Sequence, residues 1–390
     1  MMEITCTCER GHHTAPVKKI EVSEHAVEKT AELLAGYHRI YLVADENTYE
    51  AAGKRAEALL RDAGMLSHTY ILSAGAMATA ENVGEVLIHA GIKETPYRIE
   101  HFSRNPDYIL AVGSGSVNDV CRMVSYRLGI EYGVLGTAPS MDGYASVVAP
   151  LVVRNRKIIY DCTIARHIII DLSVCAKAPY ELLEAGVGDM IGKPVAILDW
   201  ELSRMLTGEY YCPTVAENVL AAAETCINAA MRLPKRRPED IRSIIDGLIG
   251  SGMGIAYTGT SRPASGTEHM VGQTWEIMDF ENHRPNHLHG IEVGEATFTA
   301  IAMFRRLYEE CDDSRIRELI GRYLPRFDAV CALQKTIHLP FAVTDHDIFT
   351  EGVLRGRTFR ERFTLLQYLY DRGMLEDYTE YAYGETMAMQ

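Results

Sequence analysis

Over the first 172 residues of the chain, short apolar runs alternate with longer stretches in which apolar residues recur at helical spacing. The runs that indicate strands are residues 39–45, 68–72, 108–112 and 167–171. The stretches that indicate helices are residues 22–34, 51–63, 81–90 and 118–128. Because strands that alternate with helices form parallel sheets covered on both faces, this half is predicted to be a Rossmann-like α/β domain.

A short break in the alternation precedes the last of these strands. The apolar run 151–153 and the run 157–160, which is apolar after Lys157, flank Arg154-Asn155-Arg156, and this pattern predicts an antiparallel hairpin. After about residue 180, runs of β-branched residues nearly vanish and the apolar spacing becomes helical. The helical stretches are residues 215–231, 241–249, 291–307, 315–323 and 359–369. We therefore expect two domains, an α/β domain over residues 1–172 and an all-α domain over residues 173–390.

Composition and charge narrow the class of protein. An apolar content of 47% and a charged content of 24% are ordinary for a soluble globular protein, and 390 residues suit two domains. A formal net charge of −14 argues against binding to nucleic acid, which requires basic surface. The start of the chain lacks the basic and apolar regions of a signal peptide, and no uncharged apolar stretch is long enough to span a bilayer. We therefore expect a cytoplasmic protein.

The cysteines raise the question of a structural metal site. Nine cysteines are scattered along the chain, and this odd number does not indicate a secreted disulfide framework. Cys6 and Cys8, followed by His12 and His13, resemble half of a zinc site. No second pair of ligands stands nearby at the spacing of a zinc finger, and structural zinc usually has four ligands. The sequence therefore favours an exposed N-terminal strand or loop over a metal site.

A glycine turn in the first half suggests a nucleotide cofactor. Residues 108–119, YILAVGSGSVND, read as a strand, a glycine turn and the start of a helix. Glycines let backbone amides approach a pyrophosphate, and the helix N-terminus adds its positive dipole end. The run lacks the third glycine of G-x-G-x-x-G, so a turn without a ligand is an equal alternative. Asp45, at the end of an earlier strand, could accept hydrogen bonds from an adenosine ribose, and could equally be a turn residue or a helix cap.

Three segments of the helical half carry side chains that could bind a metal ion. They are GVGDMIGK with Asp189, SRPASGTEH ending in His269, and HLHG with His289. One carboxylate and two imidazoles would hold a zinc-like divalent ion and leave a position open for water or substrate. For any one of these histidines, a purely structural role is the alternative.

The motifs GSGSVND, TAPSMDGYAS, GVGDMIGK, SRPASGTEH and HLHG, in this order, resemble those of the sn-glycerol-1-phosphate dehydrogenases, most closely their bacterial branch. This family belongs to the glycerol dehydrogenase and iron-containing alcohol dehydrogenase superfamily, to which dehydroquinate synthase is more distantly related. The resemblance extends from about residue 20 into the C-terminal helices. It implies a dehydroquinate synthase-like architecture and the reversible, metal-dependent reduction of dihydroxyacetone phosphate by NAD(P)H, a reaction of phospholipid metabolism. A homodimer is also implied.

The resemblance also implies roles for individual residues. The metal ligands, which are also the catalytic residues, would be Asp189, His269 and His289. The ion would be zinc or nickel, or else iron, and it would polarise the ketone oxygen as hydride arrives. The residues implied at the cofactor are Gly113, Ser114, Gly115 and Ser116 at the pyrophosphate, Asp45 at the ribose, and Thr137 and Ser140 toward the nicotinamide. Asp142 would contact the substrate hydroxyls, with a turn residue before Gly143 as the alternative.

A phosphorylated substrate requires cationic partners. Lys193 lies four residues after Asp189 and would share its face on a helix, and lysines commonly bind phosphate. The alternative is a solvent-exposed helix lysine. Arg262, seven residues before His269, is the second candidate. A basic cluster near the C-terminus is most simply interpreted as a solvated helix face; it consists of Arg355, Arg357, Arg360 and Arg362.

Three functions remain open at this point. The first is the reduction of dihydroxyacetone phosphate to sn-glycerol 1-phosphate. The second keeps the fold but changes the chemistry, as in a glycerol or other polyol dehydrogenase, another phosphorylated-ketone reductase or a sugar-phosphate cyclase. The third is a scaffold without catalysis, against which the intact ligand set argues.

Overall fold

The computed structural model describes residues 1–90 and 105–390. Within these residues the chain divides into two compact units. The first unit contains residues 1–2, 14–139 and 143–179, and the second contains residues 3–13, 140–142 and 180–390. The domain boundary predicted after residue 172 falls at the short helix α6 (Leu172–Cys175), shortly before the main segment of the second unit begins.

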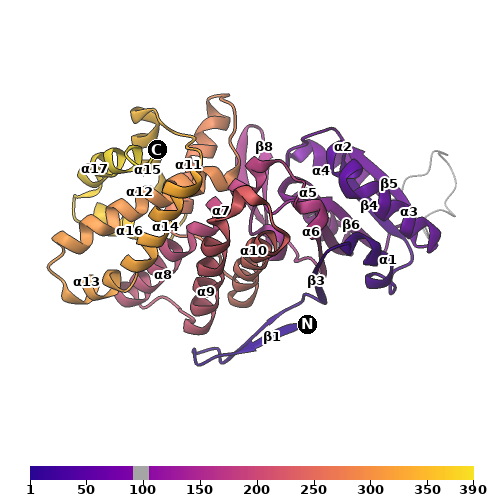
Figure 1. Ribbon diagram of the computed structural model, residues 1–390, viewed down its shortest axis with the longest axis horizontal. Coiled ribbons are helices and arrows are strands. Elements are labelled where there is room, and N and C mark those ends of the chain that lie inside the picture. Colours follow the sequence, from indigo (N-terminus) through magenta and orange to yellow (C-terminus); the bar gives the residue numbers. More distant parts are fainter. Residues whose placement is uncertain (91–104) are drawn as a thin grey trace. The chain divides into compact units, whose positions relative to one another are not determined.

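A six-stranded parallel sheet forms the core of the first unit (Figure 1). The strand order is β3-β10-β7-β6-β4-β5, and all pairs of neighbours run parallel. The strands are β3 (Lys19–Ser23), β4 (Ile40–Asp45), β5 (Leu66–Leu72), β6 (Tyr108–Gly113), β7 (Glu131–Gly136) and β10 (His167–Asp171). Every residue of β4, β6 and β10 is buried, as expected for strands covered on both faces. The predicted α/β class of this half is confirmed.

Helices connect these strands. They are α1 (Thr30–Leu33), α2 (Glu46–Thr48), the π-helical turn Tyr49–Gly53, α3 (Lys54–Asp62), α4 (Ala80–His89) and α5 (Gly115–Leu128). The prediction of one helix over residues 22–34 is wrong at its start, because residues 19–23 form the edge strand β3. The remainder is a 3-10 turn over Ala26–Lys29 followed by the single turn α1. Strand β7 was not predicted, since its sequence EYGVLG carries a charge and two glycines that resemble a turn.

The predicted hairpin is confirmed, and a second hairpin lies at the N-terminus. Strands β8 (Val148–Val153) and β9 (Arg156–Asp161) pair antiparallel. Arg154 and Asn155 have φ angles of 52° and 58°, the left-handed conformation that a two-residue turn of this kind requires. Strands β1 (Met2–Thr5) and β2 (His12–Ala15) form the other two-stranded sheet.

The second unit is helical, as predicted. Its helices are α7 (Tyr180–Ile191), α8 (Lys193–Thr207), α9 (Pro213–Ala230), α10 (Pro238–Thr258), α11 (Thr267–Glu281), α12 (His289–Glu310), α13 (Ser314–Gly321), α14 (Leu324–Ile337), α15 (His346–Gly356), α16 (Leu365–Tyr370) and α17 (Leu375–Met387). The prediction of a helix over residues 359–369 is wrong in its first part, because α16 begins only at Leu365. None of the helices in the described ranges is long and apolar enough to cross a membrane.

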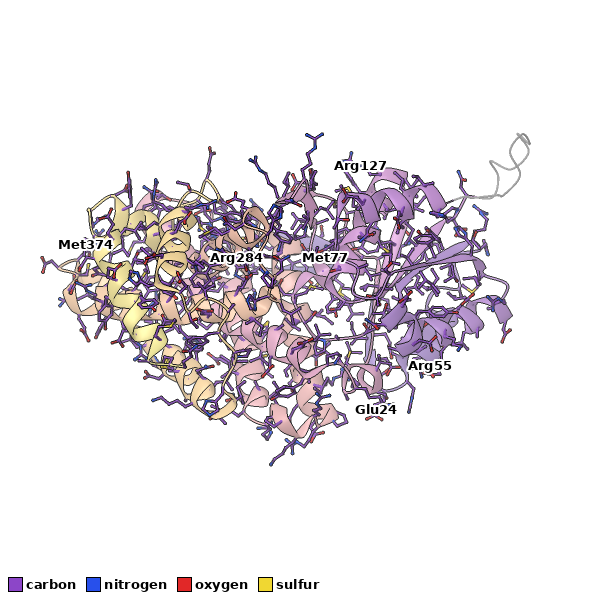
Figure 2. All side chains as sticks on the ribbon, turned by 90° about the horizontal axis from the view of Figure 1, so that it is seen from above. Glu24, Arg55, Met77, Arg127, Arg284 and Met374 are labelled. Atoms are coloured by element: carbon purple, nitrogen blue, oxygen red, sulfur yellow. The ribbon has the colours of Figure 1, made fainter. Side chains whose placement is uncertain are left out.

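Most long charged side chains lie on the surface of their unit. Arg55 and Arg127, for example, are exposed on the outside of the first unit (Figure 2). In the second unit, by contrast, Asp189 and Lys193 are fully buried. The burial of charged groups costs free energy unless they are paired. Two charged residues that are fully buried close together in the sequence therefore indicate a candidate functional site.

Candidate functional site

Three residues predicted to bind the cofactor lie at one edge of the sheet in the first unit. Strand β4 ends at Asp45, β6 ends at Gly113, and β7 ends just before Thr137. These strands are adjacent and parallel, so their carboxyl ends meet at the same edge. The chain runs from β4 outward to β5 and then returns to the other side of β4 as β6. Open α/β sheets bind ligands at such a reversal of strand order, here between Asp45 and Gly113.

The glycine turn leads directly into helix α5. A Cβ atom at Gly113 would lie 2.7 Å from the Cβ of Val117, so the turn has no room for a side chain there. Ser114 is the N-cap residue, and its hydroxyl donates to the carbonyl of Ala138 at 3.1 Å. Gly115 and Ser116 open the helix, whose first amide groups have no partner within the helix. This arrangement suits an anionic pyrophosphate, and the binding of a pyrophosphate here stays a prediction.

Asp45 caps helix α2. Its Oδ1 accepts a hydrogen bond from the Thr48 backbone N–H at 2.8 Å, and the Thr48 hydroxyl accepts one from the Asp45 N–H at 3.0 Å. The helix cap, one of the roles that the sequence left open, is therefore present. The contact with a ribose stays a prediction, to which the position of Asp45 beside the glycine turn of β6 is suited.

Asp189, His269 and His289 come together in the second unit. One ligand atom from each lies within 4.8 Å of the others. Asp189 Oδ1 is 3.5 Å from His269 Nε2, and the two imidazole centroids are 5.3 Å apart. Asp189 and His269 are buried, whereas His289 is partly exposed. The three residues stand on α7, α11 and the first position of α12.

Glycines next to the ligands set how closely these helices pack. A Cβ atom at Gly188 would lie 2.0 Å from the carbonyl oxygen of Gly290, and one at Gly290 would lie 1.8 Å from the carbonyl oxygen of Ala185. The backbones of α7 and α12 are therefore in contact. Gly188 precedes Asp189 and Gly290 follows His289, so this contact fixes the separation of the two ligands.

The donor set fits a divalent metal ion. Glu268 Oε1 lies 2.7 Å from His269 Nδ1, and this hydrogen bond directs the other imidazole nitrogen toward Asp189. Carboxylates commonly orient metal-binding histidines in this way. His289 Nδ1 is buried and has no hydrogen-bond partner in the described part of the chain, where Glu276 Oε2 lies 3.6 Å away. One carboxylate and two imidazoles suit zinc, nickel or iron.

Lys193 joins two carboxylates at this centre. Its Nζ lies 2.6 Å from Asp189 Oδ1 and 2.8 Å from Asp142 Oδ2, and it donates to the Ala264 carbonyl at 3.1 Å. The side chain is fully buried, so the alternative of a solvent-exposed lysine is wrong. Burial acts to lower the pKa of Lys193, but the carboxylates outweigh it and raise that pKa above its ordinary value. Lys193 is therefore a permanent cation between Asp142 and Asp189.

Asp142 belongs to the same network. Its Oδ2 also accepts from the Ser251 hydroxyl at 2.8 Å, and its backbone N–H donates to Asp189 Oδ2 at 2.9 Å. Its side chain thus does more than shape the turn before Gly143. Ser251 was not predicted, because it stands inside α10 with no motif around it.

The two remaining sets of basic residues differ in their partners. Arg262 is buried and forms a two-pronged ion pair with Glu209, with Nε to Oε1 at 2.8 Å. Arg360 and Arg362 each donate to the hydroxyl of Ser261 at 2.8 Å. Arg360 also reaches Gln273 Oε1 at 3.2 Å, and Arg362 reaches the Ser265 carbonyl at 2.7 Å.

The interpretation of the basic cluster as a solvated helix face is wrong for Arg360 and Arg362. Both lie in the non-helical segment before α16 and are partly buried. Burial lowers the pKa of Arg360 to about 10 and, with the neighbouring arginines, that of Arg362 to about 9. Within residues 1–90 and 105–390 neither guanidinium forms an ion pair with a carboxylate. Arg355, by contrast, pairs with Glu281 and a neighbouring glutamate on the surface of α15.

Known structures share this fold. Residues 21–179 match the family model described as iron-containing alcohol dehydrogenase. The glycerol dehydrogenase of Schizosaccharomyces pombe superposes with a TM-score of 0.67 at 14% identity, over 97% of this chain and 91% of that chain. The iron-containing alcohol dehydrogenase of Thermotoga maritima gives 0.66 at 16% identity, over 93% and 99%. The chain therefore has the fold of the iron-containing alcohol dehydrogenases, and residues 21–179 match their family model.

Sequence relatives narrow this class to a family. The glycerol-1-phosphate dehydrogenase [NAD(P)+] of Halalkalibacterium halodurans is 32% identical over 306 residues, 77% of this chain and 74% of the relative. The enzyme of that name from Bacillus subtilis is 31% identical over 77% of this chain and 75% of its own, and the one from Bacillus licheniformis 29% over 95% and 93%. The chain belongs to the glycerol-1-phosphate dehydrogenase family and is an oxidoreductase that acts on a CH–OH group.

Proposed function

We propose that this enzyme reduces dihydroxyacetone phosphate reversibly to sn-glycerol 1-phosphate with NADH or NADPH. The observation that carries the proposal is the pair Arg360 and Arg362, which both donate to the hydroxyl of Ser261, while Arg360 also donates to Gln273 on the helix that carries His269. The names of the relatives, glycerol-1-phosphate dehydrogenase [NAD(P)+], agree with such a substrate and cofactor.

The arginine pair suits a phosphate in both position and charge. Gln273, the partner of Arg360, lies four residues after His269 on α11, which is about one helical turn or ~5.4 Å. Two partly buried guanidinium groups repel each other, and a dianion between them would relieve that repulsion through charge-assisted hydrogen bonds. A neutral polyol would leave both charges uncompensated. The pair therefore favours a phosphorylated substrate over glycerol.

The basic residues first predicted to bind phosphate take supporting roles in this proposal. Lys193 already pairs with both Asp142 and Asp189, so we assign it to positioning these two carboxylates at the reacting end of the substrate. Asp142 would accept a hydrogen bond from a substrate hydroxyl. Arg262, which is engaged by Glu209, would brace the loop that carries Ser261.

The remaining parts of the active site follow the predicted residues. Gly113, Ser114, Gly115 and Ser116 would bind the cofactor pyrophosphate through backbone amides, and Asp45 the adenosine ribose. Thr137 and Ser140 would contact the nicotinamide end. A divalent ion held by Asp189, His269 and His289 would supply electrophilic polarisation of the ketone. Glu268 would keep the imidazole of His269 in the orientation that this requires.

Steady-state kinetics with two substrates that differ only in phosphate test the proposal. Arg360→Gln and Arg362→Gln should each raise the KM for dihydroxyacetone phosphate by roughly 10- to 100-fold, the effect of losing one charged hydrogen bond of about 1.5–3 kcal/mol. The same variants should leave the weak reduction of dihydroxyacetone unchanged, because that substrate has no phosphate. Arg355→Gln, on the surface of α15, is the matched control and should behave as the wild type.

A chiral assay of the product completes the test. The proposal expects sn-glycerol 1-phosphate from dihydroxyacetone phosphate and NADH. An enzyme that oxidises glycerol readily but ignores glycerol 1-phosphate would refute the assigned substrate. An unchanged KM in both arginine variants would refute the assigned phosphate site.

A further inference from the structure

A second group of metal-binding side chains lies outside the catalytic centre. One ligand atom from each of Cys6, Cys8, His13 and Cys212 lies within 4.8 Å of the other three. His13 Nε2 is almost equally distant from the three sulfur atoms, at 3.2 Å from Cys6 Sγ, 3.3 Å from Cys8 Sγ and 3.4 Å from Cys212 Sγ. His13 and Cys212 are buried, and the other two cysteines are partly buried. All four residues belong to the second unit.

From the sequence alone, no fourth ligand could be identified near Cys6, Cys8 and His13. In the structure the fourth side chain comes from a distant segment of the chain. Cys212 is the N-cap residue of α9, 199 positions after His13 in the chain. Where the sequence predicted an exposed strand or loop, the structure has the strands β1 and β2, with Cys6 and Cys8 in the turn between them and His13 buried in β2. The four ligands that a structural zinc ion usually needs are therefore assembled only by the tertiary fold.

We propose that Cys6, Cys8, His13 and Cys212 bind one structural zinc ion, separate from the catalytic metal. Zinc–sulfur bonds of about 2.3 Å and zinc–nitrogen bonds of about 2.0–2.1 Å place tetrahedral ligand atoms roughly 3.5–3.8 Å apart. The three sulfur–nitrogen separations of 3.2–3.4 Å are close to this value. With four protein ligands the site is closed, which is typical of structural rather than catalytic zinc.

Backbone hydrogen bonds fix the turn that carries the first two cysteines. The Cys6 N–H donates to the Gly11 carbonyl at 3.0 Å, and the Gly11 N–H donates to the Cys8 carbonyl at 2.9 Å. Gly11 has a φ angle of 65°, so this turn requires a left-handed residue. The turn therefore holds both thiols close to His13 Nε2.

A disulfide is the competing chemistry, and the geometry disfavours it. Cys6 Sγ and Cys8 Sγ are 2.9 Å apart, well beyond the bond length of about 2.05 Å, and both are free thiols. A disulfide between Cys6 and Cys8 would involve only two of the four clustered side chains and would not explain why His13 and Cys212 lie beside them. A zinc ion would bind all four.

The zinc ion would anchor the N-terminal segment to the helical unit. The other contacts of this segment are modest: Arg10 donates to the Thr258 carbonyl at 2.6 Å and lies 3.9 Å above the ring of Tyr210. Residues 14–139, the main part of the first unit, lie in the chain between His13 and Cys212. Zinc would thus close a long loop of the chain, and such closures can contribute strongly to stability.

Cobalt substitution of the full-length protein tests the site. Co²⁺ bound to cysteine thiolates gives a charge-transfer band in the near ultraviolet, whereas Co²⁺ bound by one carboxylate and two imidazoles does not. The band should be present in the wild type, in His269→Ala, which removes a catalytic ligand, and in Cys331→Ser, a control cysteine on α14. It should be lost in Cys8→Ser and in Cys212→Ser, and zinc analysis should show the loss of one equivalent per chain.

Stability provides a second readout. Cys8→Ser should lower the midpoint of thermal unfolding by roughly 5 °C, and chelation, which also removes the catalytic metal from both proteins, should lower the midpoint of the wild type by about that amount more than it lowers the midpoint of the variant. Activity at low temperature should be retained, because Cys8 touches no catalytic residue. If Cys212→Ser fails to fold, the cobalt spectrum and the zinc content of Cys8→Ser, whose substitution lies in the N-terminal turn, still test the proposed site. A cobalt spectrum that is the same in the wild type and in Cys8→Ser, or a Cys6–Cys8 disulfide in protein purified without oxidant, would overturn the proposal.

Discussion

At the scale of single residues, the carboxylate of Asp45 caps a helix and also has a proposed role in binding the cofactor. It caps α2 through Thr48, and it stands beside the glycine turn where we propose the cofactor binds. A serine at this position keeps the cap but removes the negative charge that would repel a 2′-phosphate. We therefore expect Asp45→Ser to raise kcat/KM for NADPH relative to NADH by roughly 10-fold, about 1.4 kcal/mol, with little change in stability.

The ratio of the two kcat/KM values, measured with a single ketone substrate, checks this. Glu46→Gln, the next residue along the chain, removes a charge at the same helix end and is the control. A ratio that stays the same in Asp45→Ser would remove Asp45 from the ribose site and leave it only as a helix cap.

Residues inside short motifs could be predicted from the sequence, and their partners in other segments could not. Asp189, His269 and His289 each stand in a recognisable motif, and the structure brings them within 4.8 Å of one another. Ser251 and Arg360 lie in segments without any motif, so only the folded chain shows that Ser251 donates to Asp142 and that Arg360 donates to Ser261. The four-ligand cysteine and histidine cluster is the same case, because Cys212 is far from its partners in the sequence.

At the scale of elements, the contact between helices α7 and α12 sets the distance between two ligands of the proposed metal site. Alanine at Gly290 would place its Cβ 1.8 Å from the Ala185 carbonyl oxygen, which is backbone and cannot turn away. The helices must separate, and Asp189 then moves away from His289. We expect Gly290→Ala to weaken metal binding at the catalytic centre by more than ~10-fold and to reduce the free energy of unfolding by about 1–3 kcal/mol.

Metal titration and thermal unfolding measure these two effects. Gly384→Ala is the matched control, since a Cβ there meets nothing within 4 Å and alanine is the better helix former in α17. It should be neutral or slightly stabilising. Metal binding by Gly290→Ala at the level of the wild type would show that the glycine contact does not set the ligand geometry.

The elements that the sequence predicted are those with the clearest periodicity. Strands β4, β6 and β10 are buried along their whole length, and each contains an uninterrupted apolar run. Strand β3 alternates too briefly, and β7 contains two glycines, so neither carries a strand signal of its own. Both are strands because the parallel neighbour β10 lies between them and offers a full ladder of hydrogen bonds. Tertiary pairing overrides local preference here.

At the scale of the whole molecule, the stability of the second unit should depend on pH through its buried carboxyls, of which Glu295 is one. Glu295 in α12 is 1% exposed. Its Oε2 accepts from the amides of Ala342 and Val343 at 2.6 and 2.9 Å, whereas Oε1 has no hydrogen-bond partner among the described residues. Burial outweighs these two amides and raises the pKa of Glu295 to about 8. In the unfolded chain a glutamate titrates near ~4.3.

The direction in which the free energy of unfolding changes with pH follows from proton linkage. Between these two pKa values the folded protein holds a proton that the unfolded chain has released, so the free energy of unfolding falls as pH rises. The stabilising contribution of protonated Glu295 is complete below about pH 4.3 and is lost as pH rises through about 8. Glu295→Gln cannot titrate, and its amide oxygen can still accept from both backbone amides. We therefore expect the variant to be more stable than the wild type at pH 9.

Thermal unfolding monitored by helical circular dichroism between pH 5 and 9, with metal held constant, distinguishes the two proteins. The difference in unfolding free energy should grow by up to about 1.4 kcal/mol per pH unit across the titration of Glu295. Glu318→Gln, on the surface of α13, is the control and should run parallel to the wild type. Because the chain has two units, the transition that loses helical signal is the one to compare. Parallel curves for Glu295→Gln and the wild type would mean that Glu295 stays ionised inside the fold, with the Ala342 and Val343 amides sufficient to hold its charge.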